Sequence, residues 1–232
     1  MRQLLMRPWA RIGVGVAVIL VVAVAVGAFY LFGGSGKSSA GDSASASTFA
    51  PSKDATILTI DPSSSQATFT IDEVLFGKPN TVVGKTNSLT GQIQVNLKDP
   101  SQSQVGQIRV DLSTLATDND LRNRTLQSRI LETAQQGNQY AVFVPKSLKG
   151  LPSTISLGQP VSFQITGDLT IHQVTRSVTF DAKVTLTSST TLTGQAQTTV
   201  SYKDFNLAIP NVPSVTGVSD TVQLALTFTA KA

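Results

Sequence analysis

The feature that most constrains the fold of this chain is a strict alternation of apolar and polar residues between positions 161 and 186. Apolar residues take every second position of the first run, 161–171: Val161, Phe163, Ile165, Gly167, Leu169 and Ile171. A second alternating run, 177–186, follows after a short connection at 172–177. A period of two is typical of strands that bury one face, so the two runs predict an antiparallel hairpin with one solvated side.

Alternating runs separated by turn-forming residues continue from position 57 to the end of the chain. They predict strands at 57–60, 67–75, 82–89, 92–97, 107–111, 140–147, 161–171, 177–186, 191–200 and 221–229. The segment 119–132 instead has leucine and isoleucine at helical spacing, and Asp118 or Asn119 can cap its start. A short helical turn is also predicted at 203–206. The apolar face of such a sheet must be covered, which predicts an all-β sandwich or a closed antiparallel β-barrel.

An apolar segment at residues 12–32 precedes the predicted sheet. As a helix its 21 residues would span about 31 Å, close to the roughly 30 Å hydrocarbon core of a bilayer. Arg2, Arg7 and Arg11 come before it, and basic residues favour the cytoplasmic side of a membrane. The sequence therefore predicts a single-pass transmembrane helix in the cell membrane, with a cytoplasmic N-terminus and an extracytoplasmic C-terminal domain. A cleaved signal peptide is the alternative, since small residues at 23–28 resemble a cleavage site, although signal peptides usually have an apolar core of only about 7 to 15 residues.

The segment after the predicted anchor, residues 33–53, is rich in Gly, Ser and Ala and has too few apolar side chains to form a core. We expect it to be a flexible linker with a root-mean-square reach on the order of 25 Å. The predicted organisation is thus a cytoplasmic N-terminus at 1–11, an anchor at 12–32, this linker, and a β-barrel domain at 54–232.

Charge and composition exclude several classes of function. The net charge of +4 comes entirely from Arg2, Arg7, Arg11 and Lys37, so the chain beyond them is neutral and lacks the electrostatic signature of nucleic-acid binding. The absence of cysteine excludes disulfides, thiolate metal sites and thiol nucleophiles. Carboxylates around 118–132 are expected to act as helix caps and a solvated face rather than as metal ligands. We therefore predict no metal site and no required cofactor.

His172 is the only histidine, and it falls in the predicted hairpin connection. With no carboxylate grouped near it in the sequence, it is predicted to be an exposed turn residue rather than a ligand or a base. No serine lies in a nucleophile-elbow sequence, and no base is available to activate one. The sequence therefore predicts no catalytic residues and a protein that is not an enzyme.

Small residues interrupt the apolar face of the predicted sheet. By alternation, this face includes Gly167, Ala182, Gly194 and Ala196. They could leave room for a guest, because an eight-stranded barrel can hold one small ligand. They could equally admit bulky side chains that fill the core, such as Phe69, Phe143, Phe205 or Phe228. The alternation leaves both possibilities open.

Five stretches of the chain form a more specific pattern: IDPSSSQATFTIDEVL, GQIQVNL, RVDLSTLATDNDLRNRTLQS, FQITGDLTIHQVTRSVTF and DFNLAIPNVPSVTGVSDTVQLALTF. In this order, and over about residues 57–232, they resemble the YceI-like family, the polyisoprenoid-binding, lipocalin-like proteins of bacteria. The resemblance implies an extended antiparallel lipocalin-like β-barrel with one short helix against it, enclosing a long apolar channel that holds an isoprenoid chain. Most of the family is small, secreted and unanchored, so the segment at 12–32 departs from its pattern.

The resemblance turns the apolar face into a predicted channel lining. It comprises Phe69, Ile71, Phe143, Phe163, Ile165, Gly167, Leu169, Phe180, Ala182, Gly194 and Ala196. Arg122, Arg124 and Arg129 lie on the predicted helix, where guanidinium groups could bind a phosphate or pyrophosphate head group. A solvated helical face is the alternative role of these arginines.

The leading hypothesis is a membrane-tethered, extracytoplasmic protein that holds an isoprenoid lipid or a quinone without catalysis. Burial of roughly several hundred Å² of isoprenoid surface, at about 25 cal/mol per Å², is sufficient for micromolar binding. The alternative is a structural or interaction β-barrel at the cell surface, filled by its own side chains. A lipid hydrolase or isomerase is a third hypothesis, but the alternation places titratable groups mostly on the solvated face.

Overall fold

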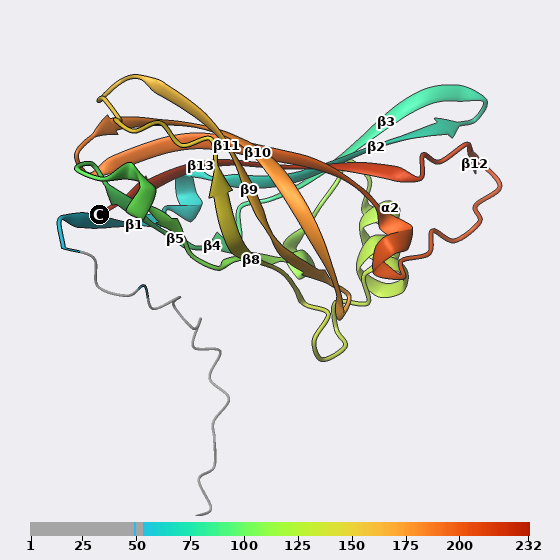
Figure 1. Ribbon diagram of the computed structural model, residues 1–232. Coiled ribbons are helices and arrows are strands. Elements are labelled where there is room, and N and C mark those ends of the chain that lie inside the picture. Colours follow the sequence, from blue (N-terminus) through green and yellow to red (C-terminus); the bar gives the residue numbers. More distant parts are fainter. Residues whose placement is uncertain (1–48, 50–52) are drawn as a thin grey trace, which may run out of the picture. The chain divides into compact units, whose positions relative to one another are not determined.

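The computed structural model describes Phe49 and residues 53–232, which form an all-β domain (Figure 1). The strands are β1 (Ala55–Ile60), β2 (Gln66–Leu75), β3 (Lys78–Thr86), β4 (Leu89–Thr90), β5 (Gln92–Asn96), β6 (Gln104–Val105), β7 (Ile108–Asp111), β8 (Tyr140–Lys149), β9 (Pro160–Ile171), β10 (Val174–Ser188), β11 (Thr191–Ser201), β12 (Val215–Thr216) and β13 (Thr221–Lys231). The helical segments are α2 (Asp120–Thr125), the π-helical turn η4 (Leu126–Ile130) and the 3₁₀ turns η1 (Pro62–Ser64), η2 (Pro100–Gln102), η3 (Leu112–Thr114) and η5 (Tyr202–Phe205).

The predicted transmembrane segment, 12–32, lies outside the described residues, as does nearly all of the predicted linker, 33–53. Among the residues that are described, no helix combines the length and the apolar character that crossing a membrane requires.

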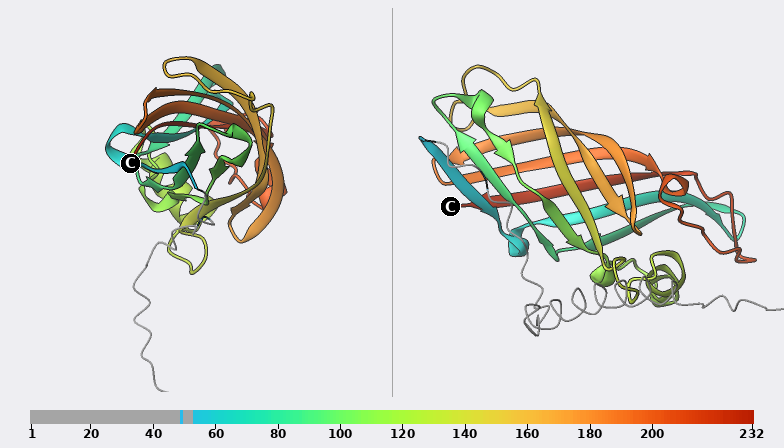
Figure 2. Two further views of the ribbon diagram at one scale, coloured as in Figure 1. Left: turned by 60° about the vertical axis from the view of Figure 1, so that its left-hand side comes forward. Right: turned by 60° about the horizontal axis from the view of Figure 1, so that its bottom comes forward.

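The strands form one antiparallel sheet that curls into a half-barrel, as the view in the left part of Figure 2 shows. Its hydrogen-bonded order is β4-β7-β8-β9-β10-β11-β13-β1-β5-β6. β13 has two partners on one side: its C-terminal end pairs with β1, and its N-terminal half pairs with β2, which also pairs with β3. Lys85 of β3 and Ala116 exchange backbone hydrogen bonds of 2.9 and 3.0 Å. These bonds connect β3 to the segment that follows β7, so the apolar faces of the strands share one interior.

The alternation in the sequence matches the burial of the strands, which confirms the prediction of an all-β antiparallel fold. In β9, Ile165, Leu169 and Ile171 are buried. The threonines between them are turned outward, where Thr166 and Thr170 bond across to hydroxyls of β10 at 2.9 and 2.8 Å. Apolar side chains on the inner face therefore form the core, while hydroxyl pairs on the outer face strengthen the strand pairing.

The connection between β9 and β10 is shorter than the predicted 172–177, and β10 begins at Val174 rather than at 177. Only His172 and Gln173 form the turn, with φ of 50° and 61°, and Val174 pairs with Ile171. Positive φ at both central residues is the geometry of a type I′ turn, which usually has Asn or Gly at these positions. Because neither residue type is present, the sequence contained no signal for the tight turn.

The β2–β3 connection is also shorter than predicted. Its turn consists of Phe76 and Gly77, with φ of 49° and 78°, and β3 begins at Lys78 rather than at the predicted 82. Pro79 lies near the start of β3, where it is tolerated because this end of β3 pairs with β2 alone and so forms an edge of the sheet. The short strands β4, β6 and β12 were not predicted.

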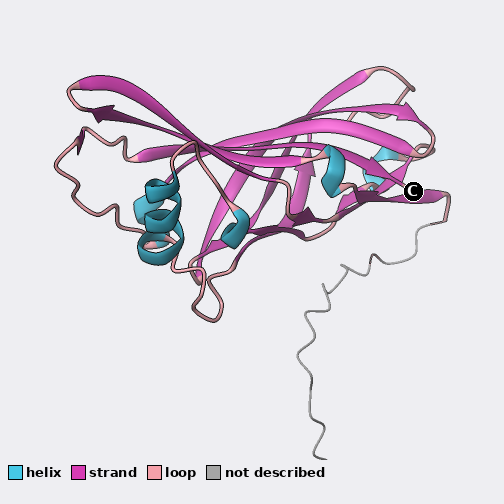
Figure 3. Cartoon of the chain, turned by 180° about the vertical axis from the view of Figure 1, so that it is seen from behind, coloured by secondary structure: helices cyan, strands magenta, loops and turns pink. Residues whose placement is uncertain are grey.

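The predicted helix at 119–132 is present as α2 and η4, residues 120–130. Asn119 caps it by accepting a 3.0 Å hydrogen bond from the Arg122 amide. The side chain of Gln127 donates to the Leu115 carbonyl oxygen at 3.3 Å and attaches the helix to the segment after β7. Figure 3 shows the helix beside the loop that leads to β12, near one end of the curled sheet.

Candidate functional site

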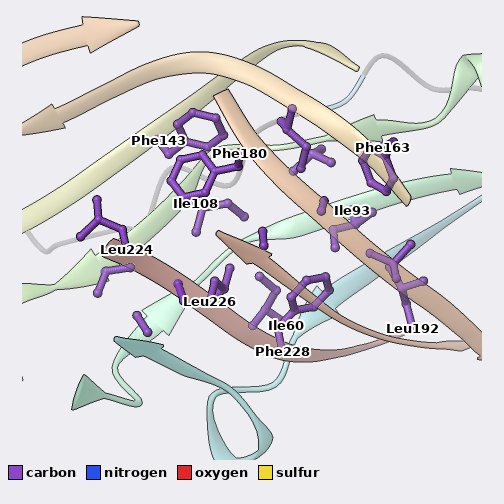
Figure 4. A pocket seen from close by; sticks show the side chains of 18 of the residues that line it. Ile60, Ile93, Ile108, Phe143, Phe163, Phe180, Leu192, Leu224, Leu226 and Phe228 are labelled. Carbon is purple, nitrogen blue, oxygen red and sulfur yellow. The ribbon is translucent and has the colours of Figure 1, made fainter. Parts of the chain in front are cut away.

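The interior of the half-barrel contains a cavity of about 210 Å³ with an almost wholly apolar lining (Figure 4). Its lining comes from β1, β2, β5 to β11 and β13 and from the loop between β8 and β9, and it includes no charged side chain among the described residues. Phe143 and Phe180 pack edge to face, with ring centroids 4.9 Å apart. Apart from Thr68, Ser103 and Gln104, the residues that line this cavity are apolar.

A row of paired residues across the sheet, which includes three alanines and is called the alanine row below, gives this cavity its depth. Ala182 of β10 lies opposite Phe163 of β9 on one side and Ala196 of β11 on the other. The row continues from Ala196 to Leu226 of β13 and then to Ala67 of β2. All five residues line the cavity. A methyl group reaches much less far inward than the phenylalanine and leucine side chains around it, so the row leaves open space at the centre of the sheet.

A second cavity, of about 520 Å³, lies between the β2–β3 hairpin, the helix formed by α2 and η4, and the loop at 206–218. Its lining includes Phe76, Leu121 and Val212, whose side chains are 79%, 69% and 40% exposed. Because these residues both line the cavity and face solvent, the second cavity opens at the surface between them.

The two cavities share part of their lining. The residues common to both are Phe69, Leu112, Leu115, Ile171 and Leu224. The cavities therefore adjoin at this apolar boundary, in the middle of the half-barrel. Their volumes lie in or near the range of about 300–1,000 Å³ that is usual for ligand sites, and together they form an elongated apolar space.

One ion pair lies in the lining of the second cavity. Arg122 of α2 approaches Glu73 of β2, with Nη2 and Oε1 3.5 Å apart, and also contacts Asp118 at 2.6 Å. The Glu73 side chain is only 9% exposed, and it also accepts a 2.9 Å hydrogen bond from Asn80. Two carboxylates thus face one guanidinium group, so this part of the site has no excess of positive charge.

The predicted lining residues are distributed over both cavities, except for two glycines. Phe69 lines both cavities and Ile71 lines the second. The first is lined by Phe143, Phe163, Ile165, Leu169, Phe180, Ala182 and Ala196. Gly167 and Gly194 line neither: a Cβ atom on Gly167 would lie 2.8 Å from Cζ of Phe143, and one on Gly194 would lie 3.0 Å from Cζ of Phe228. Phe143 and the main chain of Val144 and Pro145 therefore fill the space at Gly167, and Val184, Phe228 and the main chain of Lys183 fill it at Gly194.

The three predicted head-group arginines do not form one cluster in the site. Arg122 lines the second cavity, whereas Arg124 and Arg129 line neither cavity and are exposed. Sequence reasoning missed Glu73, which lies 49 residues from its partner Arg122, and the loop at 206–218. The absence of charge from that loop is a signal that could have pointed to it.

His172 lies in a hairpin turn as predicted, but the prediction that it is exposed and has no carboxylate nearby is wrong. Its Nε2 lies 3.1 Å from Oε2 of Glu132, and its side chain is 22% exposed. The adjacent Gln173 donates a 2.9 Å hydrogen bond to the buried Asn138. Both contacts join the β9–β10 turn to the segment after η4, and neither His172 nor Glu132 lines either of the two cavities described above.

The fold matches known proteins. The sequence profile of the YceI-like domain family matches residues 58–230. The chain is similar to a polyisoprenoid binding domain from Saccharophagus degradans, with a TM-score of 0.59, 18% identity, and coverage of 75% of this chain and 98% of that chain. It is also similar to BcnA of Burkholderia cenocepacia, with a TM-score of 0.58, 18% identity, and coverage of 74% and 99% respectively. The YCEI protein of Campylobacter jejuni has a TM-score of 0.51 and 15% identity, covering 64% of this chain and 84% of that one. No curated protein matches the chain.

Proposed function

The chain belongs to the YceI-like domain family, and we propose that it is a non-catalytic protein that holds an isoprenoid lipid or a quinone. The observation that carries this proposal is the pair of adjoining apolar cavities, of which the second opens at the surface. A long flexible apolar chain fits such an elongated space, and a similar structure is described as a polyisoprenoid binding domain. The alanine row leaves the space that the isoprenoid chain needs.

The driving force for such binding is burial of apolar surface. At about 25 cal/mol per Å², an isoprenoid chain that buries roughly 500 Å² gains about 12 kcal/mol before association costs are subtracted. With association costs of about 4 kcal/mol, the low end of their range, the remainder of about 8 kcal/mol corresponds to roughly micromolar binding. No residue of the first cavity has to change its protonation state for this to occur.

The charges of the second cavity favour a neutral head group. Arg122 is already neutralised by Glu73 and Asp118, so a pyrophosphate there would meet two carboxylates for each guanidinium. A quinone carbonyl or a prenol hydroxyl could instead accept a hydrogen bond from Arg122 without adding charge. We expect a prenylquinone or prenol to bind more tightly than a prenyl pyrophosphate of equal chain length. Tighter binding of the pyrophosphate would contradict the neutral assignment.

The deciding experiment is native mass spectrometry and organic extraction of the purified protein, with one variant that fills the cavity. Ala182→Phe places a ring in the alanine row, whereas Lys183→Phe, at the next position of β10, places the same ring on the exposed face. The wild type and Lys183→Phe should yield a bound prenyl lipid, and Ala182→Phe should lose most of it. If Ala182→Phe does not fold, Ala196→Leu replaces it as the cavity-filling variant, because it is a smaller change in the same row. An empty wild-type protein that ignores added prenyl lipids would refute lipid binding.

A structural or interaction domain with a filled core is the second candidate. It is favoured locally by Phe143 and Phe228, which occupy the space beside Gly167 and Gly194. Thermal unfolding separates the two candidates, because a ligand that binds only the folded state raises the melting temperature with its concentration. An added prenylquinone should raise the melting temperature under our proposal and leave it unchanged under the alternative.

The proposed location is extracytoplasmic, tethered to the cell membrane by residues 12–32. It is supported by the length of the apolar segment and by the arginines that precede it. The protein should remain in the membrane fraction at its full mass after a high-salt wash. A mature N-terminus near Val26 or Phe29 would instead show that a signal peptide is cleaved.

A further inference from the structure

Three exposed apolar side chains surround the mouth of the second cavity. Phe76 is at the tip of the β2–β3 hairpin, Leu121 is on α2, and Val212 is in the loop at 206–218. They are 79%, 69% and 40% exposed, and Phe76 and Leu121 are the most exposed large apolar residues in the described part of the chain. We call these three residues the apolar rim. Single exposed apolar residues are normal, but a set that rims an apolar opening is typical of an interaction site.

Phe76 occupies a position that folding alone does not favour. It has a φ of 49° in a turn whose two residues both have positive φ, where Asn, Asp or Gly is the usual choice. A bulky side chain in this backbone region costs free energy, and an exposed ring recovers little of it by packing. The strain therefore suggests that the ring contributes to something other than stability of the fold.

The loop that carries Val212 has no charged residue over fifteen positions, 205–219. At its base Lys203 and Asp220 form an ion pair of 2.6 Å, and the exposed Asp204 is the remaining charge beside it. Asn211, Val212 and Pro213 are exposed at its outer part. A long exposed loop without charge can contact an apolar or zwitterionic surface at little cost, because it has no ionised side chain, which would be costly to bring into a membrane.

Hydrogen bonds and an ion pair hold the rim segments in place. The Phe76 amide donates to the Ser214 carbonyl oxygen at 2.8 Å, and Val215 of β12 pairs with Leu75 of β2. On the other side, Arg122 of α2 contacts Glu73 of β2. The hairpin, the loop and the helix therefore present their apolar residues as one preformed surface.

We propose that the apolar rim docks on the surface of a lipid bilayer, so that the mouth of the second cavity opens into the membrane interface. A bilayer is the occupant that the charges favour, since the loop is neutral and Arg122 is paired within the protein. The choice of a bilayer rests on the proposed function, because a prenyl lipid could then enter the cavity without crossing water.

The chain outside the described domain is long enough to permit this docking. β1 and the β2–β3 tip lie at opposite ends of the sheet (Figure 1). β10, with 15 residues, extends about 50 Å along the sheet. The 21 residues at 33–53 span up to about 70 Å when extended, so an anchor at 12–32 does not prevent the rim from reaching the bilayer.

Site-specific labelling of the full chain in phosphatidylcholine vesicles tests the proposal. The chain has no cysteine, so Lys78→Cys provides one attachment point for an environment-sensitive fluorophore beside Phe76. Ser189→Cys, in the turn between β10 and β11, is the control, because Thr191 pairs with Lys231 at the β1 end of the sheet. Only the label at position 78 should gain fluorescence, shift to the blue and be quenched by a lipid-bound quencher. Equal responses at both positions would overturn the proposal.

Two further comparisons separate apolar docking from nonspecific adsorption and from electrostatic attraction to the bilayer. Replacing Phe76, Leu121 and Val212 together by serine should abolish the response at position 78. The matched triple variant, in which the exposed Leu97, Val144 and Leu157 become serine, should retain it. Vesicles with added phosphatidylglycerol should give the same response, and a response that requires anionic lipid would contradict an apolar rim. Lipid content measured on the same variants tests the proposed function separately. A protein that holds lipid but does not dock would refute membrane docking and leave the proposed function intact.

Discussion

At the scale of single residues, three glycines mark places where the half-barrel is filled by neighbouring atoms. A Cβ atom on Gly84 would meet only the ring of Phe69, with Cζ 2.6 Å away. A Cβ atom on Gly167 would also meet main chain, since Cα of Pro145 lies 2.8 Å away. A Cβ atom on the third, Gly194, would lie 2.7 Å from Cγ1 of Val184 and 3.0 Å from Cζ of Phe228. A side chain can rotate away and a paired strand cannot, so Gly84 and Gly167 should differ in how a larger residue is accommodated.

Gly84→Ala and Gly167→Ala should therefore respond differently to a compensating change. Each should destabilise the protein by about 1–3 kcal/mol, the usual cost of overpacking. Phe69→Leu should restore most of the stability of Gly84→Ala, whereas Phe143→Leu should not restore that of Gly167→Ala. Urea unfolding of the single and double variants measures this coupling. Equal rescue of both glycine variants would show that main-chain contact does not matter at Gly167.

The ion pair between Asp61 and Lys231 gives a pH dependence at the same scale. Hydrogen bonds from Lys231 and Ser63 lower the pKa of Asp61 from 3.8 to about 2. A carboxyl group whose pKa is lower in the folded state adds stability above its unfolded pKa and loses it as the pH falls through the folded value. The window is thus between about pH 3.8 and about pH 2.

Asp61→Asn should lower the urea midpoint at pH 7, and its difference from the wild type should shrink as the pH falls below about 4. Lys231→Met is the control, because it removes the main cause of the pKa shift. In its background Asp61→Asn should have little further effect. A difference that stays constant between pH 7 and about pH 2 would show that the charge of Asp61 is not responsible.

At the scale of elements, two hairpin turns combine type I′ geometry with residues that do not favour it. Phe76-Gly77 and His172-Gln173 both have positive φ at both positions. In the second turn the side chains have partners, because His172 contacts Glu132 and Gln173 bonds to Asn138. The side chain of Phe76 is 79% exposed, so its turn has no comparable compensation.

Phe76→Asn should consequently stabilise the protein by several tenths to about 1 kcal/mol, since Asn-Gly is the preferred type I′ sequence. His172→Asn should gain less or lose stability, because it removes the contact with Glu132. Chemical denaturation of both variants measures the difference. A loss of stability in Phe76→Asn would show that the exposed ring supports the fold, which would weaken its assignment to membrane docking.

At the scale of the whole domain, the boundary between the two cavities determines how long a guest can be. Leu224 of β13 lies at this boundary opposite Phe69 of β2, and both residues line both cavities. A larger side chain at position 224 would separate the cavities without changing either end. The length of the bound chain is then the property that should respond.

Leu224→Phe should lose long prenylquinones while it retains short ones that fit in the second cavity. Gln223→Phe is the control, since position 223 is the exposed neighbour on the same strand. Competition among quinones of increasing chain length, read by native mass spectrometry, measures the limit. An unchanged range of bound chain lengths in Leu224→Phe would mean that the guest does not pass the boundary.

The sequence by itself determined the strands other than β4, β6 and β12, the inward faces of these strands and the helix after β7, and it placed most of the predicted lining residues correctly. These features follow from local periodicity, because a strand that buries one face must alternate wherever it pairs. Phe163, Ala182 and Ala196 could thus be assigned to the inner face without knowledge of their neighbours.

Only the tertiary structure decided which part of that face is hollow, where the space opens and which charges meet. Gly167 and Ala182 are both small residues in the sequence, but Phe143 occupies the space at the first, while the second lines the cavity. Likewise, Glu73 meets Arg122 across 49 residues, and His172 meets Glu132 across 40. The physical reason is that packing and charge pairing depend on side chains brought together by the curl of the sheet, and local periodicity contains no information on those partners.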